Sequence, residues 1–125
     1  MTQTKTITHW INGALDTGKT ERTSEVFNPA TGQVSANVAL ANVATVDKAV
    51  NVATEAFNSW RHSSLTKRTQ VLFAFRELVL QNKEKIAALI TAEHGKVLSD
   101  AAGEVTRGLE VVEFACGIPH LLKGG

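Results

Sequence analysis

The chain has 125 residues, of which 43% are hydrophobic and 20% charged, and its formal net charge is +1. This length suits one domain, and the hydrophobic content is typical of a globular rather than a disordered chain. The nearly neutral charge provides no field that would attract nucleic acid or an anionic membrane surface, so neither is expected as a partner.

The sequence shows no signal for secretion or membrane insertion, and it contains one cysteine. The run Met1–Trp10 lacks the apolar core of a secretory signal, and no apolar stretch approaches the ~20 residues that a membrane span needs. The single cysteine, Cys116, cannot form an internal disulfide, which agrees with a reducing compartment. We therefore expect a soluble, cytoplasmic protein.

Residues 1–44 are predicted to form strands and turns. The Asn12-Gly13 pair can adopt the positive φ angles of a tight hairpin, and Pro29 with Gly32 suits a second turn. The β-favouring runs around these turns cover residues 7–11, 25–27 and 33–40.

From residue 45 to residue 125 the hydrophobic period becomes helical, and four amphipathic helices are predicted. The first begins at Thr45, which is placed to cap it, and the second follows Ser64. The third ends at Gly95, and the fourth starts near Ser99 and ends before Pro119. The sequence therefore predicts an α+β fragment, with strands first and helices after.

Two features suggest that this fragment needs neighbours. The helix faces are rich in Val, Leu and Phe, so we expect the isolated chain to aggregate or to behave as a molten globule. Gly103 and Gly108 lie inside the fourth predicted helix, where each costs up to ~1 kcal/mol relative to alanine. Close packing or the approach of a ligand is expected to favour them.

The candidates for catalysis within the chain are few. Cys116 shares a helical stripe with Val105 and Leu109 and has no adjacent base, so we interpret it as a packed thiol rather than a nucleophile. The four histidines have no metal-ligand spacing, and neither a Gly-x-Gly-x-x-Gly turn nor a phosphate loop occurs. No catalytic residue, metal site or cofactor site is predicted within residues 1–125.

Arg107 is the one candidate binding residue. It lies roughly 200° around the helix from Val105, at about 100° per residue, so it points away from the apolar stripe. Its guanidinium could bind a carboxylate in a forked geometry, beside the bare surface left by the two glycines. Alternatively, it could form a surface ion pair with Glu104 or Glu110. On residue chemistry alone both interpretations stay open.

Several motifs resemble the N-terminal part of aldehyde dehydrogenases, and in this order they cover nearly the whole chain. They are Trp10-Ile-Asn-Gly13, Phe27-Asn-Pro-Ala-Thr-Gly32, Trp60 followed by Lys67-Arg68, and Glu93-His94-Gly95-Lys96. The last motif, together with Ser99-Asp100-Ala101 and Thr106-Arg107-Gly108 through Pro119-His120, is similar to the CoA-acylating methylmalonate-semialdehyde branch in particular.

This resemblance implies a part of the α/β aldehyde dehydrogenase fold and assigns Arg107 to the carboxylate of the substrate. In a complete member, a cysteine thiolate attacks the aldehyde, hydride passes to NAD, and the thioester is transferred to coenzyme A. With malonate or methylmalonate semialdehyde, loss of CO₂ yields acetyl-CoA or propionyl-CoA, as in valine and inositol breakdown. The complete enzyme is expected to be a homo-oligomer.

The resemblance also implies that the nucleophile, the nucleotide-binding turn and the CoA-facing residues lie outside residues 1–125. We therefore expect this chain alone to bind no cofactor and to be inactive. Two alternatives stay open at this point. The chain could be part of a non-acylating aldehyde dehydrogenase, or it could be a non-enzymatic helical binding module or remnant.

Overall fold

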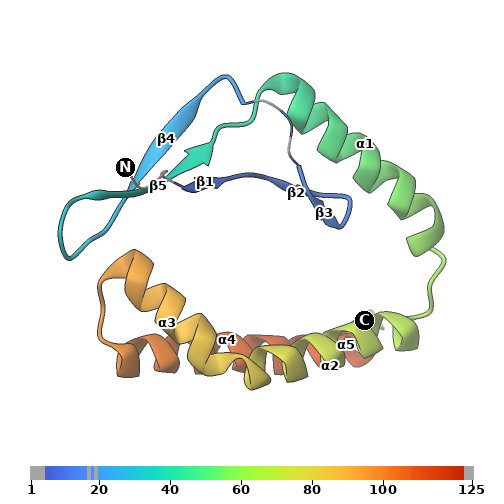
Figure 1. Cartoon of the computed structure of the whole chain (residues 1–125). Coiled ribbons are helices and arrows are strands. Elements are labelled where there is room, and N and C mark those ends of the chain that lie inside the picture. Colours follow the sequence, from blue (N-terminus) through green and yellow to red (C-terminus); the bar gives the residue numbers. More distant parts are fainter. Residues whose placement is uncertain (1–4, 17, 19, 123–125) are drawn as a thin grey trace. The chain divides into compact units, whose positions relative to one another are not determined.

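The computed structural model describes residues 5–16, 18 and 20–122. The first residues of the Met1–Trp10 run and the terminal Gly124-Gly125 pair lie outside the described residues. The chain divides into two compact units, which we call the N-terminal unit, residues 1–62, and the C-terminal unit, residues 63–125 (Figure 1).

The N-terminal unit is built on a three-stranded sheet in the order β1-β5-β4. Strand β1 runs parallel to β5, and β4 runs antiparallel to it. The central strand β5 buries Ala36 and Ala39, whereas β2 and β3 form a separate two-stranded hairpin. The strands of the described residues are β1 (Lys5–Ile7), β2 (Trp10–Ile11), β3 (Ala14–Leu15), β4 (Thr23–Phe27) and β5 (Val34–Ala39).

The two predicted turns are confirmed. Asn12 and Gly13 have φ angles of 55° and 73° in the β2-β3 hairpin, and Gly32 has a φ angle of 69° between β4 and β5. In this second turn the Gly32 N–H donates to the Asn28 carbonyl oxygen at 2.8 Å, and the Asn28 side chain accepts the Ala30 N–H at 2.9 Å. The predicted run 7–11, by contrast, is not one strand, because β1 ends at Ile7 and β2 starts at Trp10.

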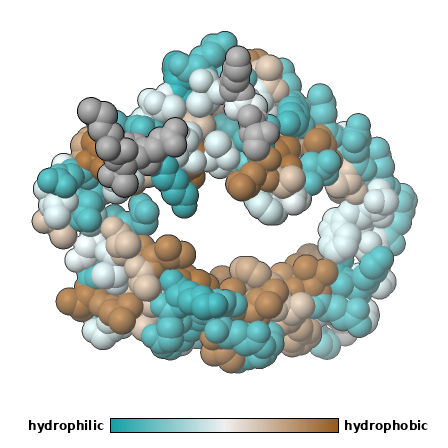
Figure 2. All heavy atoms as spheres, viewed as in Figure 1, coloured by the Kyte–Doolittle hydropathy of each residue, from teal (hydrophilic) through white to brown (hydrophobic). Residues whose placement is uncertain are grey.

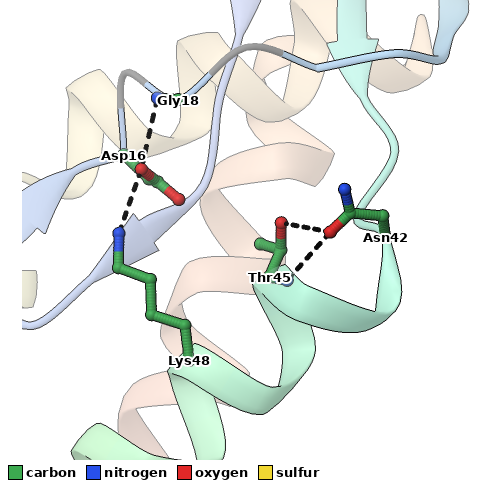
Figure 3. Close-up of polar contacts among 5 residues, drawn as sticks. All are labelled: Asp16, Gly18, Asn42, Thr45 and Lys48. Carbon is green, nitrogen blue, oxygen red and sulfur yellow. Dashed lines mark hydrogen bonds and ion pairs between the residues drawn. The ribbon is translucent and has the colours of Figure 1, made fainter.

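Helix α1 (Val43–Trp60) belongs to the N-terminal unit, and its cap differs from the prediction. The cap is Asn42, whose extended backbone precedes the helix and whose Oδ1 accepts the Thr45 N–H at 2.9 Å (Figure 3). Thr45 lies inside the first turn, and its hydroxyl donates to the same oxygen at 2.9 Å. The cap therefore lies three residues earlier than predicted.

The C-terminal unit consists of helices packed around small side chains. Helix α4 contacts both α2 and α3. Ala87, Ala101 and Val105 are buried together at these contacts. The helices are α2 (Leu65–Gln81), α3 (Lys83–His94), α4 (Leu98–Cys116) and α5 (Ile118–Leu121).

The ends of these helices mostly follow the sequence signals. The Ser64 hydroxyl accepts the Lys67 N–H at 3.2 Å and caps α2, and Gly95 ends α3 with a left-handed φ of 85°. The short helix α5 was not predicted. Pro119 lies in its first turn, where a missing N–H costs no helical hydrogen bond, so the residue that ends one helix also starts the next.

Large apolar side chains remain exposed on both units. The whole of α1 contains no buried residue, and Phe73, Phe75 and Leu78 of α2 are more than half exposed. Figure 2 shows hydrophobic side chains gathered over the helices of the C-terminal unit. Exposed apolar faces of this kind favour association, so aggregation or molten behaviour of the isolated chain stays our prediction. Among the described residues, no helix is both long and apolar enough to cross a membrane.

Candidate functional site

Helix α4 places Arg107 on the side opposite its packed stripe. Ala101, Val105 and Leu109 are buried on one side of α4, whereas the Arg107 side chain is 67% exposed. The orientation inferred from the helical period is therefore confirmed. Because the buried stripe fixes α4 against α2 and α3, the guanidinium projects from a supported helix rather than from a loop.

Arg107 shares a carboxylate with a second cation. Its Nη2 lies 3.3 Å from Glu104 Oε1, and the Lys96 ammonium donates to this same oxygen. Lys96 and Arg107 together lower the pKa of the Glu104 carboxyl, chiefly through the hydrogen bond from Lys96. The ion pair with Glu104 that the sequence left as an alternative is thus present. It does not exclude a ligand, because it is a single exposed contact.

The two glycines of α4 are not closely packed within the described chain. A Cβ at Gly103 would lie 3.7 Å from Arg107 Nη1, and a Cβ at Gly108 would meet nothing within 4 Å. Of the two reasons predicted for these glycines, close packing is therefore not found among the described residues. The approach of a ligand stays a prediction.

Two exposed apolar residues share the face of Arg107, and the sequence analysis missed them. Val111 and Phe114 lie four and seven residues after Arg107, so a helix brings all three to one side. Val111 is 69% exposed and Phe114 is 70% exposed. The signal was available, since both interrupt the polar side of α4 at helical spacing from Arg107. A guanidinium beside apolar side chains suits a small ligand that carries one carboxylate.

Cys116 is buried near the C-terminal end of α4, as its place on the apolar stripe predicted. It lines a pocket with Phe73, Arg76 and Glu113. Arg76 donates from Nε and Nη2 to Glu113 Oε1 at 3.0 and 2.7 Å, so its charge is engaged by a carboxylate rather than by the thiol. In the part of the chain that the structure describes, no group of His, Cys, Asp or Glu is arranged to hold a metal ion.

Comparison with known proteins decides the family. The profile of the aldehyde dehydrogenase family matches residues 16–125. The chain belongs to this family. It is 48% identical over 121 residues to malonate-semialdehyde dehydrogenase of Pseudomonas aeruginosa, a match that covers 95% of this chain and 24% of that protein. It is 44% identical to malonate-semialdehyde dehydrogenase 2 of Oceanobacillus iheyensis, with 99% of this chain and 26% of the relative covered.

A solved structure confirms the fold. The described chain superposes with a TM-score of 0.92 and 40% identity on a Sinorhizobium meliloti protein, described as a methylmalonate-semialdehyde dehydrogenase and solved in complex with NAD. This match covers 98% of our chain and 25% of that protein. The predicted α+β fragment of an aldehyde dehydrogenase fold is therefore confirmed, and the chain spans about a quarter of the length of these relatives.

The sequence and the surroundings of Arg107 bear on the kind of ligand that this segment could contact. The sequence contains no glycine-rich turn of the kind that holds a dinucleotide pyrophosphate at a helix N-terminus. The exposed polar groups around Arg107 would suit a carboxylate rather than a nicotinamide or an adenine ring. Among the described residues, Arg107 is therefore a candidate contact for a substrate carboxylate.

Proposed function

We propose that this chain is the N-terminal segment of an NAD-dependent, CoA-acylating malonate- or methylmalonate-semialdehyde dehydrogenase. We propose further that its own contribution to the reaction is to bind the substrate carboxylate through Arg107. The complete enzyme would use NAD as the hydride acceptor and coenzyme A as the acyl acceptor. Its homo-oligomeric state, its cytoplasmic location and its part in valine or inositol breakdown are predictions that rest on the family resemblance.

The exposed guanidinium of Arg107 is the observation that carries this proposal. It projects from a packed helix, lies over Gly103 and is flanked at helical spacing by the apolar Val111 and Phe114. A semialdehyde with a carboxylate needs such a charged donor for its acid group, together with apolar contact for its carbon chain. The names of the two relatives, both malonate-semialdehyde dehydrogenases, agree with this substrate class.

The chemistry of Arg107 would be to bind and orient. Its planar fork can donate two parallel hydrogen bonds to one carboxylate, which fixes the substrate in direction as well as in place. Orientation of this kind lowers the barrier of a reaction that takes place elsewhere on the same substrate. We assign no bond-breaking step to this segment; its buried thiol, Cys116, shares a pocket with the Arg76–Glu113 ion pair.

The test uses what we call the joined enzyme, in which residues 1–125 are linked to the remaining three quarters of the Pseudomonas aeruginosa relative. Arg107→Leu should lower kcat/KM for methylmalonate semialdehyde about ten- to a hundredfold, the usual scale for a charged hydrogen bond. Steady-state kinetics with propanal, which lacks a carboxylate, should show a much smaller loss. Arg107→Lys should restore only part of the activity, because a point charge cannot reproduce the fork.

Equal losses for the two aldehydes would mean that Arg107 supports the helix rather than the substrate, and they would overturn its assignment. A second assay separates the acylating reaction from the non-acylating alternative. The joined enzyme should form a CoA thioester from the semialdehyde in the presence of coenzyme A. Release of the free acid at the same rate with and without coenzyme A would favour a non-acylating enzyme instead.

A further inference from the structure

We propose that Lys96 is a positioning residue that holds the Glu104 carboxylate. The positive charge of Arg107 is then not neutralised by Glu104, and its N–H donors stay available for a carboxylate ligand. The inference rests on the proposed function of Arg107 and adds two residues to its site. Glu104 would act as the built-in competitor of the substrate, and Lys96 would decide how strongly it competes.

The geometry is that of one carboxylate oxygen between two cations. Glu104 Oε1 accepts a hydrogen bond from the Lys96 ammonium and lies 3.3 Å from Arg107 Nη2. The Lys96 side chain is only 20% exposed, whereas that of Arg107 is 67% exposed. Contacts of less exposed charges are less screened by water and salt. Lys96 is therefore the dominant partner of Glu104, and Arg107 is the weaker one.

The local structure explains how Lys96 comes to this place. Gly95 ends α3 in the left-handed conformation, and Lys96 follows it in the short link that leads into α4. Glu104 lies two turns into α4 and Arg107 one turn further, at i+3. The link thus brings a cation from outside the helix to a carboxylate that also contacts Arg107.

The net charge of the three side chains decides how strongly the cluster attracts a carboxylate ligand. Two cations and one carboxylate leave a net charge of +1 on the cluster, and that charge remains mainly on the more exposed guanidinium. A guanidinium has five N–H donors, and the contact with Glu104 involves only its Nη2 atom. Without Lys96, the cluster would become a neutral Glu104–Arg107 pair, and its attraction for an incoming carboxylate would weaken.

Kinetics of the joined enzyme test this inference. Lys96→Met should raise KM for methylmalonate semialdehyde about two- to fivefold, the scale of an exposed charge pair, with kcat unchanged and propanal unaffected. Adding Glu104→Gln to Lys96→Met should return KM to near the original value, because the competitor is then uncharged. Lys85→Met is the matched control. Lys85 lies in the same unit, and its ammonium donates to Asn82, so KM should not change.

The outcomes separate the inference from the proposed function. If Arg107→Leu is selective for the semialdehyde while Lys96→Met has no effect, or if Glu104→Gln fails to rescue it, then Arg107 binds the substrate and Lys96 has no positioning role. If neither variant is selective, the proposed function fails as well.

A titration of the joined enzyme needs no turnover. By carboxyl ¹³C NMR, Lys96→Met should raise the pKa of Glu104 more than Arg107→Leu does. The opposite order, or an unshifted Glu104 in the unsubstituted joined enzyme, would overturn the inference.

Discussion

The two units of the chain are held together in different ways. The N-terminal unit buries few side chains, Ala36 and Ala39 among its described residues, and its elements are fixed by strand pairing, turns and caps. The C-terminal unit has a packed core in which helices meet over Ala87 and Ala101, both with no exposed area. Hydrogen bonds between strands and within turns dominate in one unit, and side-chain packing between helices dominates in the other.

This difference matters for where a binding residue can be placed. Orientation of a substrate requires a side chain on an element that does not shift, and packing between helices provides this better than exposed hydrogen bonds do. Arg107 lies on α4, the helix that contacts both of its longer neighbours. In the N-terminal unit, α1 carries no buried residue and offers no comparable support within the described chain.

The largest expected effect comes from overfilling the packed core. Ala87→Leu should destabilise the C-terminal unit by about 1–3 kcal/mol, because a well-packed core has no space for three more carbon atoms. Far-UV circular dichroism of the joined enzyme during thermal unfolding should show an earlier loss of helix. The fluorescence of Trp10 and Trp60 should change little, because both belong to the N-terminal unit.

Ala88→Leu is the matched control, since Ala88 is the next residue of α3 and is exposed. The same side chain there should leave the transition within about 0.5 kcal/mol of its original value. Similar losses at the two positions would show that the alanine core is not tightly packed. An equal shift of the fluorescence transition would show that the two units unfold together, and the contrast between them would then be wrong.

A smaller effect is expected from the cap of α1, which tests the polar side of the comparison. Asn42→Ala should cost about 1 kcal/mol, because it leaves the Thr45 N–H without its acceptor. Thr45→Ala removes only the hydroxyl that donates to the same oxygen, so it should cost less. Denaturant unfolding followed by tryptophan fluorescence measures both. A greater loss for Thr45→Ala would restore the sequence prediction that Thr45 is the cap.

The elements could be predicted wherever their signals are local. The helical period located the four longer helices, and Ser64 and Gly95 marked their ends because a cap acts on its own turn. The predicted cap of α1 was wrong because Asn42 and Thr45 are both residue types that cap helices. They lie three positions apart, and only the backbone conformation distinguishes the cap from a residue of the first turn. Helix α5 was missed because a proline ends one helix and starts another by the same chemistry.

The candidate site was predictable only in part, for a related reason. The direction of Arg107 followed from the helical period, and its possible partner Glu104 from the i−3 spacing. Lys96 was not found, because it lies eight residues before Glu104 and reaches it only through the turn at Gly95. The pair of Arg76 and Glu113 spans 37 residues and depends on how α2 packs against α4, which no local pattern specifies.

The smallest expected effect concerns Asp16, where the N-terminal unit joins a hairpin to α1. Asp16 Oδ1 accepts the Gly18 N–H and the Lys48 ammonium, each at 3.2 Å (Figure 3). These contacts lower the pKa of Asp16 below its ordinary value of 3.8, the Gly18 hydrogen bond most. Because folding lowers this pKa, the ionised carboxylate stabilises the fold at pH values above the pKa of the unfolded state. This contribution is lost as the pH falls from 3.8 through the folded pKa. With Asp16→Asn, the free energy of unfolding should therefore depend less on pH below 3.8.

Lys48→Met tests which contact matters more. Carboxyl ¹³C NMR should show that the pKa of Asp16 stays lowered for the most part, because the backbone donor remains. A return of the Asp16 pKa to 3.8 in Lys48→Met would mean that the ion pair with α1, rather than the local turn, holds this carboxylate.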